Sequence, residues 1–203
     1  MKLLHIDSSI LGSNSVSRAL SAEIVARQVA LHPVIEVAYR DLASDPALHL
    51  SSGHLAAWQG RQVADMAFGK DVALGGSYVD EFIAADIIVI GAPMYNFTVP
   101  SQLKAWIDRV TVAGKTFRYT ENGPESLLPK GKKVLIASAR GGIYAPGTPA
   151  AALEHHESYL TAVLGFIGLR DVTIVRAEGV ALSAEARAGA IARARADIGA
   201  LAA

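Results

Sequence analysis

Two hydrophobic periods alternate along this chain from end to end. Short apolar runs typical of strands occur at 3–6, 35–39, 87–91, 134–137 and 172–175. Between and after them, apolar residues recur every three or four positions, as on one face of a helix, at 17–31, 77–85, 101–113, 151–167 and 184–201. The alternation predicts five successive βα units.

The character of the runs indicates how the strands are arranged. Segments 87–91 and 134–137 are apolar on both faces, which is typical of central parallel strands covered by helices on each side. In 35–39 apolar and polar residues alternate, which favours a place near the sheet edge. We therefore predict an α/β fold with a doubly wound five-stranded parallel sheet in the flavodoxin-like order 2-1-3-4-5, as a single domain over 1–203.

Two segments are less regular. In 43–76 the pattern predicts a helix at about 53–68, a break at Gly75 and Gly76, and a new helix that begins at Ser77 with Asp80 in a capping box. Segment 115–132 holds several Gly and Pro residues and predicts an irregular or hairpin-like excursion.

Composition excludes several classes of protein. The 19 Lys and Arg balance the 19 Asp and Glu, so no broad basic face for nucleic acid or an anionic membrane is expected. The chain has no cysteine, which excludes disulfides, thiolate catalysis and Cys-based metal sites. The apolar stretches within 1–10 and 83–92 are too short and too polar for a signal peptide or a membrane span, so a cytoplasmic protein is expected.

In a doubly wound sheet, ligands bind outside the carboxyl ends of the strands, here after the first, third and fourth. After the first strand, the hydroxyls of Ser9, Ser15 and Ser17 adjoin a helix N-terminus, whose free amides favour a phosphate. The Gly spacing of dinucleotide sites and the Walker motif are both missing, which leaves a monophosphate. Alternatively, the serines only cap the helix and fill a turn.

After the third strand, Met94, Tyr95, Asn96 and Phe97 place a thioether, two aromatic rings and an amide where a flat conjugated ligand would cover them. Asn96 could bond to the edge of a heteroaromatic ring. The alternative is that the aromatic side chains pack beneath a neighbouring loop.

After the fourth strand comes Ala139-Arg140-Gly141-Gly142. Paired glycines let backbone amides approach a ligand closely, and a guanidinium or amide there would stabilise negative charge on a reduced pyrimidine-dione. Gly-Gly can equally form an ordinary turn. Together the three loops match the phosphate, ring edge and dione of flavin mononucleotide (FMN).

Motifs over most of the chain resemble the FMN-dependent NADH azoreductases and quinone reductases of the flavodoxin-like fold. The motifs stand at 8–11, 15–17, 92–97, 116–125, 140–142, 164–168 and 177–179. The resemblance implies a homodimer with one tightly bound FMN per subunit. It places the phosphate on Ser9, Ser15, Val16 and Ser17, and the isoalloxazine against Met94, Tyr95, Asn96, Phe97, Ala139, Arg140, Gly141 and Gly142.

The resemblance also concerns the substrate pocket. The 115–132 excursion would lie near the dimer interface, with Tyr119 bordering the partner's pocket. Val163 stands where some relatives have an aromatic pocket residue, which implies a wider cleft. Two further departures, Ala139 for a frequent Ser and Val16 for a frequent Gln, remove side-chain contacts to FMN.

The implied activity is ping-pong reduction of quinones and azo compounds by NADH or NADPH, with no catalytic side chain and no metal. A hydrolase of the acyl carrier protein phosphodiesterase type is one alternative, but the chain has no Gly-x-Ser-x-Gly elbow. Segment 154–157, rich in His and Glu, lacks zinc spacing and is interpreted as a solvated helix surface. A flavodoxin-like electron carrier is the other alternative, although such carriers are usually acidic.

Several side chains are assigned to surface or core from the pattern alone. Arg18 is expected to face water, and His54 to lie on a loop or surface. His5 is expected to be a bonded core or strand residue. Trp58 and Trp106 are expected to be core or interface anchors.

Overall fold

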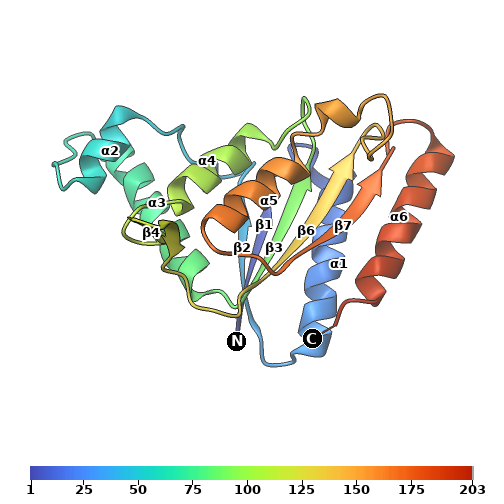
Figure 1. The fold of residues 1–203 in the computed structure, drawn as a ribbon, viewed down its shortest axis with the longest axis horizontal. Helices are drawn as coiled ribbons and strands as arrows, with labels where there is room; N and C mark the ends of the chain where they lie inside the picture. The colour runs from blue at the N-terminus through green and yellow to red at the C-terminus, as the bar shows by residue number, and fades with distance from the viewer. Residues whose placement is uncertain (203) are drawn as a thin grey trace.

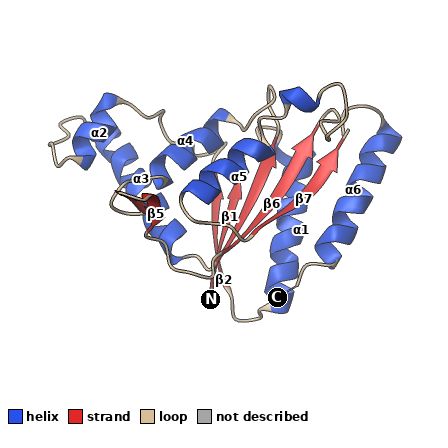
Figure 2. Ribbon diagram, viewed as in Figure 1, coloured by secondary structure: helices blue, strands red, loops and turns tan. Residues whose placement is uncertain are grey.

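The computed structural model describes residues 1–202. Five parallel strands form one sheet in the order β2-β1-β3-β6-β7 (Figure 2). Their bounds are Lys2–Asp7 for β1, Glu36–Asp41 for β2, Ile87–Pro93 for β3, Lys133–Arg140 for β6 and Val172–Glu178 for β7. Counted along the chain within this sheet, the order is 2-1-3-4-5, so the predicted fold is confirmed.

Helices cover both faces of the sheet (Figure 1). One face carries α1 (Val16–Leu31) and α6 (Ala184–Gly199), and the other carries α3 (Met66–Ala84), α4 (Ser101–Val110) and α5 (Glu157–Phe166). The short α2 (Ser52–Trp58) lies beyond the sheet, next to α3. Within residues 1–202 no helix is both long and apolar enough to span a bilayer.

Strand β3 shows why two helical layers are needed. Ile88 and Ile90 pack in the core beneath α3, α4 and α5, whereas Ile87 and Val89 pack in the core beneath α1 and α6. Because successive side chains of a strand point to opposite faces, a strand that is apolar at every position needs cover on both sides. The prediction of a central strand here is confirmed, and β2, whose residues are exposed or half-buried, lies at the edge as predicted.

The prediction for 53–68 and 77–85 is wrong. The helix α2 ends at Trp58, and a loop leads to Asp65, whose carboxylate accepts a bond from the Phe68 amide and caps α3. The helix α3 then continues through Gly75 and Gly76 without a break. Gly75 is buried against the side chain of Arg109 on α4, where an added Cβ would make ordinary contacts of 3.4–3.7 Å, so this glycine belongs to the packed face of α3 and does not end the helix.

The 115–132 excursion contains an antiparallel hairpin, β4 (Phe117–Thr120) paired with β5 (Gly123–Ser126), as predicted. Two single 3₁₀ turns complete the fold, at Gly12–Asn14 and Ala151–Leu153. Helix α5 follows the second turn and begins later than the predicted start at residue 151.

Candidate functional site

The three loops at the carboxyl ends of β1, β3 and β6 line one cavity of about 240 Å³. The predicted site residues among its walls are Ser9, Ser15, Val16, Ser17, Met94, Tyr95, Ala139 and Gly141. Leu11, Asn14 and Pro93 complete the walls from these loops, and Val180, Ala181 and Arg187 contribute from the segment between β7 and α6 and from α6 itself. The structure thus brings together side chains that are up to 178 positions apart, from Ser9 to Arg187.

The N-terminus of α1 opens into this cavity. Ser15 is its N-cap, and the Ser15 hydroxyl accepts a bond from the Arg18 amide at 3.3 Å. The hydroxyls of Ser15 and Ser17 lie 3.1 Å apart. The amides of Val16 and Ser17 have no hydrogen-bond partner within the described chain, because the first amides of a helix have no carbonyl one turn earlier. Two free amides and two hydroxyls therefore gather where the helix dipole is positive.

Arg18 fixes the loop that precedes this helix, contrary to the expectation that it faces water. Its Nε and Nη2 donate to the Ser9 carbonyl at 3.0 and 2.8 Å, and its Nη1 and Nη2 donate to the Asp41 carboxylate. The bond from Arg18 lowers the pKa of Asp41 to about 2. This fork ties the carbonyl of Ser9 to the end of β2.

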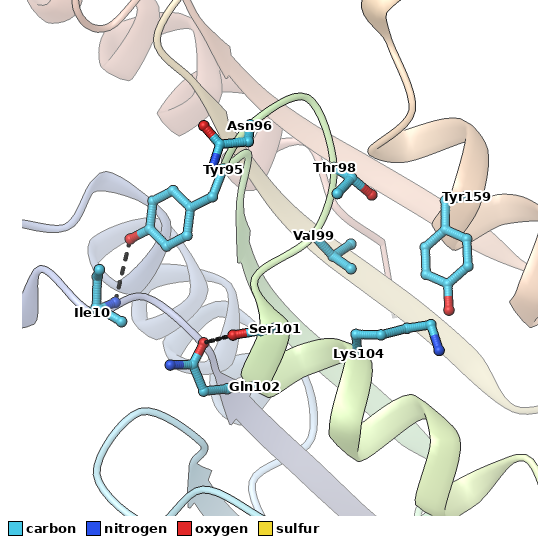
Figure 3. Close-up of a pocket in the computed structure, with 9 residues that line it drawn as sticks. All are labelled: Ile10, Tyr95, Asn96, Thr98, Val99, Ser101, Gln102, Lys104 and Tyr159. Carbon is cyan, nitrogen blue, oxygen red and sulfur yellow. Dashed lines mark hydrogen bonds between the residues drawn. The ribbon is translucent and has the colours of Figure 1, made fainter. Parts of the chain in front are cut away.

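Tyr95 joins the loop after β1 to the loop after β3. Its phenol oxygen lies 3.1 Å from the Ser9 hydroxyl and accepts a bond from the Ile10 amide at 3.3 Å (Figure 3). The Leu11 amide donates to the same Ser9 hydroxyl. The two loops therefore form one hydrogen-bonded wall of the cavity.

Asn96 and Phe97 form a strained turn beside Tyr95. Both have positive φ, 47° and 74°, and they are the only residues other than Gly with positive φ among residues 1–202. Tyr95 and Thr98 close the turn with two backbone bonds of 2.9 and 3.1 Å, the pattern of a tight hairpin. A left-handed residue other than Gly costs roughly 1–2 kcal/mol, more readily tolerated by Asn than by Phe. Such strain is concentrated at functional sites.

The turn also borders a second, larger cavity of about 540 Å³ (Figure 3). Ile10, Tyr95 and Asn96 form one side of it, and Lys104 and Tyr159 the other. Tyr95 lines both cavities, so the two cavities lie next to each other. A flat ligand held by the three loops would have room beside it.

At the end of β6, the side chain of Arg140 points into the protein. It is almost fully buried, and its Nη2 lies 3.0 Å from Glu157 and 3.7 Å from Glu178. Burial raises the pKa of Glu157, but bonds from Arg176 and Ser138 outweigh this, and the pKa lies below its ordinary value. The guanidinium of Arg140 is thereby engaged with carboxylates, and what its loop offers the cavity is backbone.

The glycines of this loop have close neighbours. A Cβ on Gly141 would lie 3.3 Å from the Cβ of Ala181, and one on Gly142 would lie 3.3 Å from the Tyr144 ring. Tyr144 in turn packs edge-on against Phe97, with ring centroids 6.3 Å apart. The loops after β3 and β6 therefore contact each other through aromatic side chains.

The two predicted substrate-pocket residues lie elsewhere. Tyr119, on β4, is 73% exposed and packs against Phe117 at 5.2 Å between ring centroids. Val163, on α5, is half-buried against the core beneath α3, α4 and α5. Neither lines the two cavities described above.

The sequence pattern missed a buried polar cluster below the first loop. The Asp7 carboxylate accepts bonds from the Ser21 hydroxyl at 2.7 Å and the Tyr39 phenol at 3.1 Å. His5 joins it through Ser21, at 3.1 Å, as a bonded core residue. The signal was a charged residue at the end of an apolar strand, which a single sequence does not distinguish from a strand end in water.

Other surface assignments also fail. His54 is 1% exposed, with its Nε2 2.9 Å from Asp71 on α3. His156, expected on a solvated helix surface, is fully buried, and burial lowers its pKa to about 4. Trp106 is a core residue, as expected, whereas Trp58 is 40% exposed. Among residues 1–202, no group of three His, Asp or Glu is placed to hold a metal ion.

Known proteins share this sequence and fold. Residues 1–202 match the family described as having a flavodoxin-like fold. An FMN-dependent NADH:quinone oxidoreductase of Bradyrhizobium sp. strain BTAi1 is 58% identical over 195 residues, 96% of each chain. A protein of the same name from Xanthomonas campestris pv. campestris is 54% identical over 202 residues, 99% of each chain.

A solved structure agrees closely in its backbone. The FMN-dependent NADH-azoreductase of Bacillus anthracis, determined in complex with FMN, matches with a TM-score of 0.85 and 27% identity, covering 100% of both chains. The chain therefore belongs to the family of FMN-dependent NADH:quinone oxidoreductases and azoreductases, on a flavodoxin-like fold.

Proposed function

We propose that this protein is an FMN-dependent oxidoreductase that takes a hydride from NADH or NADPH and reduces quinones and azo compounds. The observation that carries the proposal is the cavity where Ser15, Tyr95 and Gly141 meet from three separate loops. The names of the Bradyrhizobium and Xanthomonas proteins support the quinone activity, and that of the Bacillus anthracis protein supports the azo activity and FMN.

The cavity suits the phosphate of FMN at one end. The free amides of Val16 and Ser17 can donate to phosphate oxygens, and the hydroxyls of Ser9, Ser15 and Ser17 add donors. Backbone amides suffice here, so Val16 needs no polar side chain to take part. Arg18 contributes by holding the Ser9 carbonyl in place and not by touching the phosphate.

The other end suits the isoalloxazine ring. Met94, Tyr95, Asn96 and Phe97 would lie along it, held by the left-handed turn, and the backbone of Ala139–Gly142 would meet its dione edge. Gly141 leaves the space that a side chain would take. Arg140 acts through its buried charge and its backbone, since its guanidinium is occupied by Glu157.

When bound, FMN would supply the two-electron redox chemistry that couples oxidation of the nicotinamide to reduction of the second substrate. The chain itself needs no side-chain nucleophile for this. Its residues bind, orient and shield: the three loops set the position of the ring, and the second cavity beside Asn96 offers the place where nicotinamide and acceptor would lie in turn. Because the nicotinamide and the acceptor would occupy the same cavity one after the other, we expect ping-pong kinetics.

A homodimer completes the proposed site. Tyr119 stands exposed on the β4–β5 hairpin, away from the cavities of its own chain, and Phe166 on α5 is also partly exposed beside Phe117 of the hairpin. An exposed aromatic surface of this kind favours a protein contact. We propose that the hairpin borders the partner's pocket and that Val163 widens the cleft. The cytoplasmic location stays a prediction from the sequence.

The experiment is a visible spectrum of the purified protein. Flavin absorbance that NADH bleaches and a quinone restores is the expected result. Protein that binds FMN but passes no electrons to quinones or azo dyes would favour the electron-carrier alternative. Protein that binds no flavin and cleaves a phosphodiester would support the hydrolase.

A further inference from the structure

Arg187 lines the same cavity as Ser9, Ser15 and Ser17, although nothing in the three loop motifs points to it. It lies in the first turn of α6, which begins at Ala184. Its Nη2 donates to the Asn14 carbonyl at 3.2 Å, next to the N-cap of α1. The side chain therefore reaches from the last helix to the loop where the phosphate is proposed to bind.

The charge of this region depends on Arg187. Among the residues of 1–202 that line the cavity, it alone is charged. A phosphate monoester carries about −1.5 to −2 charges at neutral pH. The hydroxyls are neutral, and a helix N-terminus contributes only about half a positive charge. The amides and serines can satisfy the oxygens of a phosphate but leave most of its charge unbalanced.

The other arginines near the three loops are already committed. Arg18 donates to Asp41 and to the Ser9 carbonyl, and Arg140 is paired with Glu157 inside the protein. Arg187 has no carboxylate partner among the described residues, and the one hydrogen bond of its guanidinium goes to the Asn14 carbonyl. Its remaining guanidinium N–H groups are the cationic donors left for an anionic ligand.

We propose that Arg187 is a specificity-determining residue that selects phosphorylated flavin over riboflavin. The inference rests on the proposed function, since it assigns the phosphate end of FMN to this cavity. A guanidinium hydrogen-bonded to a phosphate is among the stronger polar contacts in proteins, and riboflavin, with a hydroxyl at that position, cannot use it. Arg187 thus adds discrimination by charge to the neutral phosphate donors of the loop after β1, while the loops after β3 and β6 recognise the ring that the two flavins share.

The test measures dissociation constants of FMN and riboflavin for the flavin-free protein, by quenching of flavin fluorescence. Arg187→Gln is expected to weaken FMN binding about tenfold and to change riboflavin binding less than about twofold. Arg187→Lys keeps the charge and should keep most of the preference. Arg193→Gln is the matched control, an exposed arginine of the same helix that does not line the cavity. Added salt should weaken FMN binding more in the parent than in Arg187→Gln.

The outcomes separate this inference from the proposed function. Equal weakening of both flavins by Arg187→Gln would mean that Arg187 only fixes the Asn14 loop, and it would overturn the inference while FMN binding stands. An unchanged preference for FMN in Arg187→Gln would overturn it as well. A parent protein that binds neither flavin would instead contradict the proposed function. The Arg187→Gln fold is checked by its unfolding midpoint, and if that variant does not fold, the ratio measured on Arg187→Lys and the salt dependence of the parent decide.

Discussion

The hydroxyl of Ser9 lies 3.1 Å from the phenol oxygen of Tyr95, so the loops after β1 and β3 are bonded directly to each other. Strand β3 neighbours β1 in the sheet, with Asp7 opposite Gly91, and the two loops leave the sheet side by side. The bond therefore links the proposed phosphate end of the site to the proposed ring end. The phenol of Tyr95 can therefore set the distance between the phosphate end and the ring end.

Replacing Tyr95 by Phe tests this link. Tyr95→Phe keeps the ring but removes the bonds to the Ser9 hydroxyl and the Ile10 amide. We expect FMN to bind about three- to tenfold more weakly, because a typical hydrogen bond contributes about 0.5–1.5 kcal/mol and the loop becomes less fixed. Titration of the flavin-free protein with FMN measures this. Tyr159→Phe, across the second cavity, is the control, and equal effects of the two changes would contradict the assignment.

Gly91 on β3 faces the carboxylate of Asp7 at the end of β1. A Cβ at this position would overlap Asp7 Oδ1, which already accepts a bond from Ser21 at 2.7 Å. Gly91→Ala is therefore expected to lower the free energy of unfolding by about 1–3 kcal/mol, the usual cost of overpacking. Urea denaturation followed by circular dichroism measures it.

Gly76 provides the opposite case for comparison. It lies inside α3 with nothing within 4 Å of an added Cβ. Gly76→Ala should raise the free energy of unfolding by about 0.5–1 kcal/mol, because Ala has the higher helix propensity. If Gly91→Ala proved as harmless as Gly76→Ala, the close approach of Asp7 to β3 would be wrong.

The sheet could be predicted because its signal is local. Ile87 to Ile90 are apolar at every position, and a strand of this kind needs cover on both faces wherever it occurs. The same holds for the loops at the site, whose places follow from the parallel order of the strands. Ser15, Tyr95 and Gly141 meet at one cavity for that reason.

What could not be predicted depends on distant partners. Gly75 looked like a helix break, and only its packing against Arg109, 34 positions later on α4, shows that it lies on the buried face of a continuous helix. Arg140 was assigned toward the ligand, yet Glu157 draws its guanidinium inward. Arg187 follows the last strand, outside the three loops that attract attention in the sequence. In each case the residue type was visible and its partner was not.

His156 makes stability depend on pH. The side chain is fully buried, and burial lowers its pKa to about 4 from an ordinary 6.5, so the folded protein holds it neutral. Between these two values the unfolded chain binds a proton there and the folded chain does not. Its contribution is fully retained above pH 6.5 and is lost as the pH falls toward 4, by up to about 3 kcal/mol in total.

The measurement is the free energy of unfolding from pH 7.5 to 4.5. In His156→Gln the loss with falling pH should be smaller than in the parent, whatever the change at pH 7.5. His155→Gln, the exposed neighbour, should retain the slope of the parent. A His156→Gln variant with the parent's full slope would show that other groups cause the acid sensitivity.

The buried amide of Gln28 predicts a stabilising substitution. Gln28 on α1 is 0% exposed, and neither its Oε1 nor its Nε2 has a hydrogen-bond partner within the described residues. An unpaired buried polar group costs about 1–3 kcal/mol, because it gives up its bonds to water and gains none. Gln28→Leu has a similar size and should raise the free energy of unfolding by about 1 kcal/mol or more. Gln62→Leu, on the exposed loop before α3, should change it by less than about 0.5 kcal/mol. A loss of stability in Gln28→Leu would mean that the amide is bonded in solution, with water inside the α1 face of the core as its partner.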